Sequence, residues 1–342
     1  MDGETPGNPD NPTASRGQML SLDGSVAGEL EGIRRVAYDG TELPVSEADV
    51  VEAEITTRDI DRGSFPHFLL KEISEAPRSF RKMLRGKLVE VDGELTVRLS
   101  SQTMPDGIRE RLGNGSIRRV VVVGQGTAAV AGQSLALLLQ REIDGHIQVD
   151  ATPGTELSGF HLRSDMSDTL VVAISQSGTT TDTNRTVDLV RGRGAAVIAI
   201  VNRRNSDLTD KSDGVLYTSD GRDVEMSVAS TKAFYAQIAA GALLAIAIAD
   251  ALGNVLDDES TQRRRRLLAG LRELPDAMTR VLDSREEIGK AAAELAPSRR
   301  YWAIVGNGPN VVAAREIRIK LSELCYKSIA ADSTEDKKHI DL

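Results

Sequence analysis

The sequence predicts an α/β protein: a doubly wound, parallel sheet of five strands, followed by a second, incomplete unit of the same type. Apolar strand runs alternate with amphipathic helical segments through residues 119–251, which is typical of parallel sheets wound by right-handed crossovers. Aromatic residues make up only 3% of the chain, so the core must consist of small and branched aliphatic residues. A strand, a Gly-rich turn and a helix begin again at residue 301.

The first 85 residues precede the predicted sheet. Residues 1–18 are rich in proline and polar residues, and we expect a disordered tail without a signal peptide. Residues 19–85 are predicted as a lead-in segment, with short strands, a hairpin turn at Asp39-Gly40 and a helix from His67 to Gly86. Pro77 is expected to kink or restart this helix.

The first complete unit is predicted at residues 86–255. It begins with two short strands, at the runs LVEV and LTVRL. The strands of the sheet are expected at 119–123, 146–149, 170–175, 195–201 and 214–217, and the helices at 127–141, 180–193 and 230–251. The last helix is Ala-rich, and its apolar stretch is shorter than the roughly 20 residues of a membrane span. We therefore interpret it as a buried helix.

Two segments follow this unit. Residues 256–298 combine helical periodicity with high charge, including Arg263–Arg266, and are predicted as linker helices with a solvated face. Residues 299–342 are predicted as the truncated start of the second unit. Because a doubly wound unit needs about 150 residues, we expect that its other strands come from another chain or, preferably, that the polypeptide is a fragment.

Charge and cysteine content limit the function classes. The chain has 42 Lys and Arg against 51 Asp and Glu, a net charge of −9, which argues against binding to nucleic acid or to a membrane surface. The single cysteine, Cys325, cannot form an intrachain disulfide, which favours a reducing, cytoplasmic compartment. We predict neither a metal site nor a cofactor.

The segment VVAISQSGTTTDT, residues 171–183, is the strongest local signal. An apolar strand runs into a hydroxyl-rich turn that begins a helix, and ligands of open α/β sheets bind at the carboxyl ends of strands. The helix N-terminus offers free N–H groups and a positive dipole end. Hydroxyls surround the same point: Ser175, Ser177, Thr179 and Thr180. This predicts a phosphate site without a lysine, with helix capping and no ligand as the alternative.

Two further turns are compatible with ligand binding. Gly124-Gln125-Gly126-Thr127 suggests either a dinucleotide site or a tight turn under a sugar phosphate, to which Thr127 could donate. A dinucleotide site needs an acid at the end of the next strand, where Asp150 comes too early. Ser230 precedes the long helix, either as a second anion or hydroxyl contact or as a plain cap with Lys232 in solvent.

Three charged residues share one face of the last predicted helix. Glu316, Lys320 and Glu323 recur at i, i+4 and i+7. Such a face is usually a surface ladder of salt bridges, yet the apolar neighbours favour partial burial, where a carboxylate can move protons. His339 is isolated in a charged segment and predicts nothing by itself.

Together, the motifs GQGTAAVAG, SQSGTTTDT, VASTKAF and KLSELCY followed by KKH resemble the isomerase half of the glutamine–fructose-6-phosphate aminotransferase family. The similarity runs from about residue 20 to 342 and includes the segment DRGSFPHFLLKEISEAPRSFRKMLRGKL. It implies a flavodoxin-like sugar-isomerase (SIS) fold and a substrate that is fructose 6-phosphate or a related sugar phosphate. The implied reaction makes glucosamine 6-phosphate, with ammonia derived from glutamine, in amino-sugar biosynthesis.

The resemblance also implies roles for single positions. The implied substrate-binding residues are Thr127, Ser175, Gln176, Ser177, Thr180, Val228 and Ser230. Glu323 corresponds to the base that moves a proton between C1 and C2 of the sugar, with Lys320 and Glu316 as supporting charges. His339 corresponds to the ring-opening histidine, which reaches into the neighbouring subunit's site, so a homodimer is implied.

The chain departs from the family pattern at several points. No early cysteine follows Met1, so we expect the glutaminase half to be absent or to be a separate domain, and no lysine can be assigned to the family's Schiff base. Ala128 replaces a serine that contacts phosphate, and His339-Ile340-Asp341 replaces an HGP turn. An isomerase domain that binds a sugar phosphate with little or no turnover on its own is therefore the first hypothesis. A non-catalytic sugar-phosphate sensor is the second, and a nicotinamide dehydrogenase is a weaker third.

Overall fold

The structure is a computed structural model that describes residues 18–47, 50, 59–143, 145, 147–220, 222–253 and 256–341. Its contacts divide the chain into two units, residues 1–56 and 57–342. The predicted disordered tail, apart from Gln18, lies outside the described residues. The division falls inside the expected lead-in segment, so the hairpin and the helix of that segment belong to different units.

The first unit contains a three-stranded antiparallel sheet in the order β1-β2-β3. Its elements are β1 (Gln18–Leu22), the short turns η1 (Gly24–Val26) and η2 (Leu30–Gly32), β2 (Ile33–Ala37) and β3 (Glu42–Leu43). The predicted hairpin joins β2 to β3, and its turn is closed by a hydrogen bond of 2.9 Å from the Gly40 N–H to the Ala37 carbonyl.

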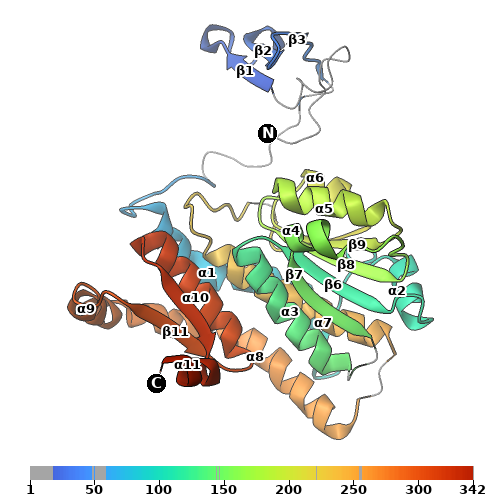
Figure 1. Cartoon of the computed structure of the whole chain (residues 1–342), viewed down its shortest axis with the longest axis vertical. Helices are drawn as coiled ribbons and strands as arrows, with labels where there is room; N and C mark the ends of the chain where they lie inside the picture. The colour runs from blue at the N-terminus through green and yellow to red at the C-terminus, as the bar shows by residue number, and fades with distance from the viewer. Residues whose placement is uncertain are drawn as a thin grey trace. The chain divides into compact units, whose positions relative to one another are not determined.

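The second unit is built around the predicted five-stranded sheet (Figure 1). Its strands are β6 (Arg119–Gly124), β7 (Gln148–Pro153), β8 (Thr169–Ser175), β9 (Ala196–Val201) and β10 (Gly214–Tyr217). All neighbouring strands are parallel, in the order β7-β6-β8-β9-β10. Numbered along the chain, this is the 2-1-3-4-5 order of flavodoxin-like folds, which confirms the predicted fold class.

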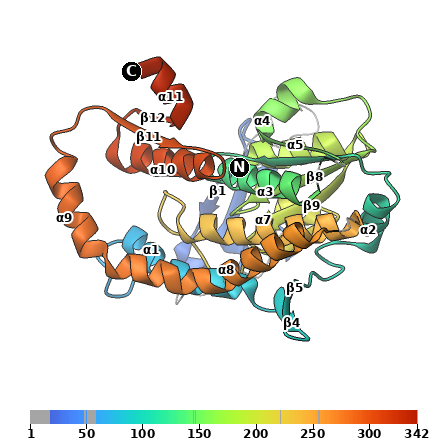
Figure 2. The same cartoon turned by 90° about the horizontal axis from the view of Figure 1, so that it is seen from below.

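Helices cover both faces of this sheet, as the two views in Figures 1 and 2 show. One face carries α3 (Thr127–Ile143) and α7 (Lys232–Ala251), and the other carries α5 (Thr181–Arg191) and α6 (Asp207–Asp210). Because strand side chains alternate between faces, the core has two parts. Every residue of β8 and β9 is buried, as expected for central strands covered on both sides.

Helix α7 is the predicted Ala-rich core helix. By length and composition alone it could cross a membrane, but 83% of its most apolar window is buried inside the protein. Small residues let it pack closely on α3, because a Cβ built at Gly241 would lie 3.1 Å from the Cβ of Leu135. Its burial against α3 and the sheet supports the interpretation as a core helix.

Several shorter elements surround this core. They are α1 (Phe68–Leu84), β4 (Leu88–Val91), β5 (Glu94–Val97), α2 (Asp106–Gly113), α4 (Gly154–Glu156) and the π-helical turn η4 (Leu157–His161). Helix α1 runs through Pro77 without the predicted restart, and Pro77 is buried in it. Helix α2 was not predicted from the sequence.

The predicted linker consists of two helices, α8 (Asp258–Asp283) and α9 (Arg285–Leu295). Helix α8 is more than a solvated connection, because Leu268 and Leu271 join the main core. Arg264, one of the four consecutive arginines, also bonds to the buried Glu142 of α3, with 2.9 Å between Nε and Oε2. Part of this basic run therefore stabilises the fold.

The last segment repeats the strand–helix–strand pattern on a smaller scale. It comprises β11 (Trp302–Gly306), α10 (Asn310–Cys325), β12 (Ile329–Ser333) and α11 (Thr334–Asp341). Strands β11 and β12 are parallel neighbours in a two-stranded sheet. Helix α10 connects them and also packs against α3, which brings the charged face of α10 toward the five-stranded sheet.

Candidate functional site

A cavity of about 270 Å³ lies where β6 and β8 end. The two strands are neighbours, but the chain leaves β6 for β7 on the other side, so their carboxyl ends form the topological switch point at which open α/β sheets bind ligands. All seven residues predicted to bind substrate line this one cavity: Thr127, Ser175, Gln176, Ser177, Thr180, Val228 and Ser230.

The loop between β8 and α5 is held in shape by its own polar groups. Ser175 is 3% exposed, and its Oγ accepts the Gly178 N–H at 3.0 Å and lies 3.3 Å from the hydroxyl of Thr180. Gly178 has a φ of 69°, and a Cβ built there would lie 2.0 Å from the Oγ of Ser206. This position therefore requires glycine.

The N-terminus of α5 faces this loop and offers donors to a ligand. Thr180 is the N-cap residue, yet its side chain makes no capping hydrogen bond to the first N–H groups of α5. Among the described residues that line the cavity, Glu225 is the only charged one. An anion bound here would thus be held by N–H and hydroxyl groups without a cation, as predicted.

Glu225 occupies the second helix N-terminus at this cavity. Its carboxylate accepts the N–H groups of Thr231 at 2.7 Å and Ala233 at 3.1 Å, and the Ser230 hydroxyl at 3.0 Å. An internal anion therefore already satisfies the start of α7. This carboxylate fills the second anion contact considered at Ser230, so the start of α5 is the candidate for anion binding.

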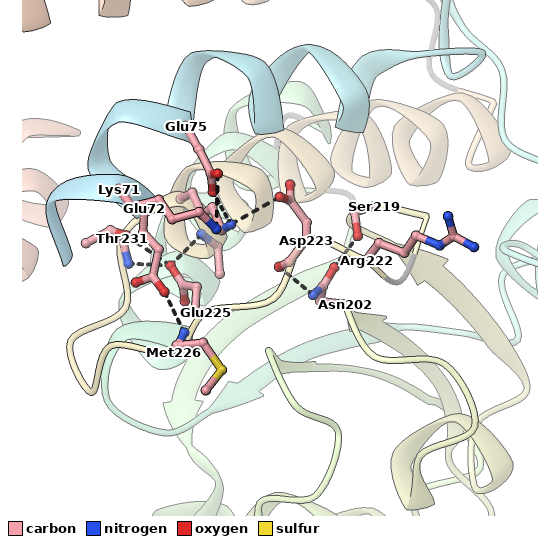
Figure 3. A network of polar contacts seen from close by, with 12 residues as sticks. Lys71, Glu72, Glu75, Asn202, Ser219, Arg222, Asp223, Glu225, Met226 and Thr231 are labelled. Carbon is pink, nitrogen blue, oxygen red and sulfur yellow. Dashed lines mark hydrogen bonds and ion pairs between the residues drawn. The ribbon is translucent and has the colours of Figure 1, made fainter. Parts of the chain in front are cut away.

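Lys232 follows this loop and is buried, which corrects the expectation that it lies in solvent. It is 2% exposed, and its Nζ lies 2.7 Å from Glu75 of α1 and 3.3 Å from Asp223. Figure 3 shows this ion-pair network, in which α1 faces the segment that leads from β10 to α7. The charged group of Lys232 therefore forms ion pairs inside the protein instead of contacting solvent.

Helix α10 comes next to the cavity at Glu316, which bonds to the lining residue Thr127 but does not line the cavity itself. Its Oε1 accepts the Thr127 hydroxyl at 3.0 Å, while its Oε2 is buried without a hydrogen-bond partner. Burial raises the pKa of Glu316 above the ordinary value, although Lys320 and the Thr127 hydroxyl act in the opposite direction. A carboxyl group that retains its proton more readily than usual thus lies beside the cavity.

Comparison with known proteins identifies the domain that contains the cavity. Residues 116–247 match the family model described as the SIS domain. This segment is similar to SIS domains and is referred to as the SIS domain. This segment holds the five strands and every residue that lines the cavity.

Relatives of the chain extend the similarity beyond the SIS domain. It is 34% identical over 304 residues to the glutamine–fructose-6-phosphate aminotransferase of Corynebacterium glutamicum, covering 88% of the chain and 45% of the relative. It is 33% identical over 326 residues to that of Symbiobacterium thermophilum, covering 94% and 50%. The chain therefore spans about half the length of these relatives, and the resemblance predicted from the motifs is confirmed.

A solved structure supports the same fold. The C-terminal domain of glucosamine-fructose-6-phosphate aminotransferase from Francisella tularensis matches with a TM-score of 0.68 and 23% identity, over 82% of this chain and 73% of that chain. The alternative of a regulatory sugar-phosphate-binding protein is not favoured by these relatives. A dinucleotide site is not favoured by the strand after α3 either, because β7 places Asp150 in its middle and ends at Pro153.

None of the four predicted catalytic residues lines the cavity of the SIS domain. Lys320 places its Nζ 3.4 Å from Glu316 and 3.0 Å from Glu323, so the three residues share one face of α10 as predicted. The side chain of Glu323 is 41% exposed, and neither it nor Lys320 lines the cavity. His339 is exposed on α11 and does not line the cavity either.

Sequence analysis missed several residues of the site. Gln125, Ile174, Glu225, Ser227 and Gln237 also line the cavity of the SIS domain. A carboxylate a few residues before a helix start is a signal that could have identified Glu225, because acids stabilise helix N-termini. Gln237 carried no such signal, since it lies in an apolar helix; it is 2% exposed, and its Oε1 has no hydrogen-bond partner.

Proposed function

We propose that the SIS domain binds fructose 6-phosphate, or a related hexose 6-phosphate, in the cavity between β6 and β8. The observation that carries this proposal is that seven residues from three separate motifs line one cavity at the switch point of the sheet. The names of the relatives, glutamine–fructose-6-phosphate aminotransferases, favour this sugar.

The electrostatics of the cavity favour one orientation of the ligand. The phosphate binds at the start of α5, where the segment 175–180 offers hydroxyl and N–H donors. The sugar extends toward Thr127, because the carboxylate of Glu225 repels the phosphate but accepts hydrogen bonds from hydroxyls. Glu316 lies behind Thr127 and restrains its hydroxyl at 3.0 Å.

The reaction proposed for this site is the isomerase step named in these relatives. In the proposed reaction, ammonia adds to the C2 carbonyl of the open-chain sugar and water leaves, which forms an imine at C2. Glu323 then removes a proton from C1 and returns it to C2, while the proton of the C1 hydroxyl passes to the nitrogen. The ketose imine thereby becomes a 2-amino aldose without net oxidation. Lys320 forms an ion pair with the carboxylate of Glu323, with 3.0 Å between Nζ and Oε2. His339 of a neighbouring subunit opens the sugar ring, so the active form proposed is a homodimer. A glutaminase domain supplies the ammonia.

The proposed location is the cytoplasm. The support is the single cysteine, Cys325, together with the chemistry of a phosphorylated metabolite.

Isothermal titration calorimetry with fructose 6-phosphate tests the binding site. The double variant Ser175→Ala, Ser177→Ala removes two hydroxyls from the phosphate loop and is expected to lose binding. The matched control is Ser158→Ala, Ser212→Ala, which removes two hydroxyls of the same domain outside the cavity. The proposal fails if the first double variant binds as tightly as the wild type.

Proton transfer is tested separately by NMR in deuterated water. The wild type, incubated with fructose 6-phosphate, is expected to exchange the C1 proton of the sugar for deuterium, and Glu323→Gln is expected to slow this exchange at least about 100-fold. Exchange at the wild-type rate in Glu323→Gln would remove this residue from the proton transfer.

A further inference from the structure

The loop that forms one wall of the cavity has no regular structure of its own. In the described part of the chain, the backbone groups of residues 222–230 make no hydrogen bonds to other backbone groups. Segments without such bonds open at low free-energy cost unless side chains hold them. The loop has side-chain hydrogen bonds of its own, from the Ser227 hydroxyl to the Ala229 carbonyl and from the Ser230 hydroxyl to Glu225, each at 3.0 Å. Contacts from outside the loop add to these in setting the position of Ser227 and Val228, which line the cavity.

Glu72 of α1 provides the contacts that hold this loop. It is 1% exposed, and its Oε1 accepts the N–H groups of Met226 and, at 3.2 Å, of Ser227, while its Oε2 accepts the Ser227 hydroxyl. Figure 3 shows Glu72 directed from α1 toward Met226. Hydrogen bonds to a charged acceptor are about twice as strong as neutral ones, so this one side chain fixes two consecutive residues of the loop.

A second acid of α1 holds the end of the same loop. Glu75 lies one turn after Glu72 on the same helix face, and it pairs with Lys232, the first residue of α7. Glu72 and Glu75 both precede residues 116–247, so they lie outside the SIS domain as matched. Neither of them lines the cavity. Helix α1 thus supports a wall of a site to which it contributes no lining residue.

We propose that Glu72 is a positioning residue for the sugar-phosphate cavity. It fixes the loop at Met226 and Ser227, so that Ser227, Val228 and Ser230 face the ligand in a preformed wall. This inference rests on the proposed function, because it assigns a sugar phosphate as the ligand. Loss of the Glu72 carboxylate leaves the phosphate loop at 175–180 intact but makes the opposite wall mobile.

The test compares Glu72→Gln with a matched variant, Glu142→Gln. Glu142 is also a buried acid that ties two helices together, through Arg264, but it does not line the cavity. Hydrogen exchange followed by mass spectrometry reports on the loop, and calorimetry with fructose 6-phosphate reports on affinity. Glu72→Gln is expected to speed exchange at the amides of Met226 and Ser227 by about tenfold, and to weaken binding by about tenfold.

The two variants are expected to differ, which distinguishes a positioning role in the loop from a general contribution to stability. Glu142→Gln should lower the thermal midpoint but keep wild-type exchange in the loop and wild-type affinity. Should Glu72→Gln fail to fold, Glu72→Asp keeps the charge on a side chain one methylene shorter, and faster loop exchange with weaker binding is expected from it as well.

Either of two results would overturn the inference: unchanged loop exchange in a folded Glu72 variant, or faster exchange with unchanged affinity. If the wild type itself does not bind fructose 6-phosphate, the proposed function fails, and the exchange data alone decide whether Glu72 fixes the loop.

Discussion

At the scale of single residues, the cavity depends on neutral polar groups. Ser175 uses its Oγ to accept the Gly178 N–H, so this hydroxyl both shapes the loop and faces the cavity. Gln237 differs, because its buried Oε1 has no hydrogen-bond partner among the described residues although Gln237 lines the cavity. Buried polar atoms are nearly always paired, so we infer that this amide oxygen accepts a hydrogen bond from a hydroxyl of the bound ligand.

Replacement of this amide tests that inference. Gln237→Leu keeps the approximate size of the side chain but removes the acceptor, and we expect fructose 6-phosphate to bind about tenfold more weakly. Because the change removes an unpaired buried atom, the thermal midpoint should not fall. Calorimetry and thermal unfolding measure the two quantities, and unchanged affinity would show that Gln237 makes no bond to the ligand.

Gly178 determines the shape of the phosphate loop. Gly178→Ala places a side chain at a positive φ, which costs about 1–2 kcal/mol, and also in collision with Ser206. Gly115→Ala is the matched control, because Gly115 has a φ of 75° but no atom within 4 Å of its built Cβ. Urea unfolding should show a larger loss of stability for Gly178→Ala; equal losses would contradict the collision.

At the scale of elements, the sequence predicts best those helices and strands that have a clear local pattern of apolar residues. Continuous apolar runs gave the buried strands, and β10 was predicted at its observed bounds, 214–217. Helix α2 was missed because only two of its residues, Ile108 and Leu112, are buried, too few for a clear period. The restart at Pro77 was wrong because burial of this residue against the core outweighs the lost hydrogen bond.

The packing of α7 on α3 gives a prediction at this scale. Alanine normally stabilises a helix by about 0.5–1 kcal/mol relative to glycine, and Gly270→Ala in α8 should show this gain because nothing lies within 4 Å of its built Cβ. Gly241→Ala meets Leu135 at 3.1 Å and should gain nothing or lose stability. Urea unfolding compares the two, and a full gain at Gly241 would mean that α7 can shift away from α3.

At the scale of the whole molecule, the candidate site is assembled from distant segments. The motifs and the family resemblance predicted seven of its thirteen lining residues, most of which lie at a strand end or a helix start. Glu72 and Ser227 are 155 positions apart, and Thr127 and Glu316 are 189 apart. No local pattern encodes such pairs, so these contacts could only be found in the folded chain.

Glu316 connects α10 to α3 through its bond to Thr127. The pKa of Tyr235 of α7 is raised by burial and, to a smaller extent, by the charge of Glu316. Because burial raises the pKa of Glu316 in the folded state, folding favours its protonated form. Its contribution to stability is therefore complete below its ordinary value of 4.5 and is lost as the pH rises through the raised value.

Glu316→Gln should remove this dependence. In urea unfolding at increasing pH from 4.5, the stability of the variant should rise relative to that of the wild type. Glu323→Gln serves as the control, because that side chain is 41% exposed. Parallel stability curves for the wild type and Glu316→Gln would contradict the assignment.

A crystal structure of the chain with fructose 6-phosphate tests the central claim most directly. We predict that the phosphate lies at the start of α5, within hydrogen-bond distance of the segment 175–180, with the sugar between Thr127 and Glu225. A phosphate bound away from that segment, or a ligand reversed so that its phosphate lies against Glu225, would contradict the account.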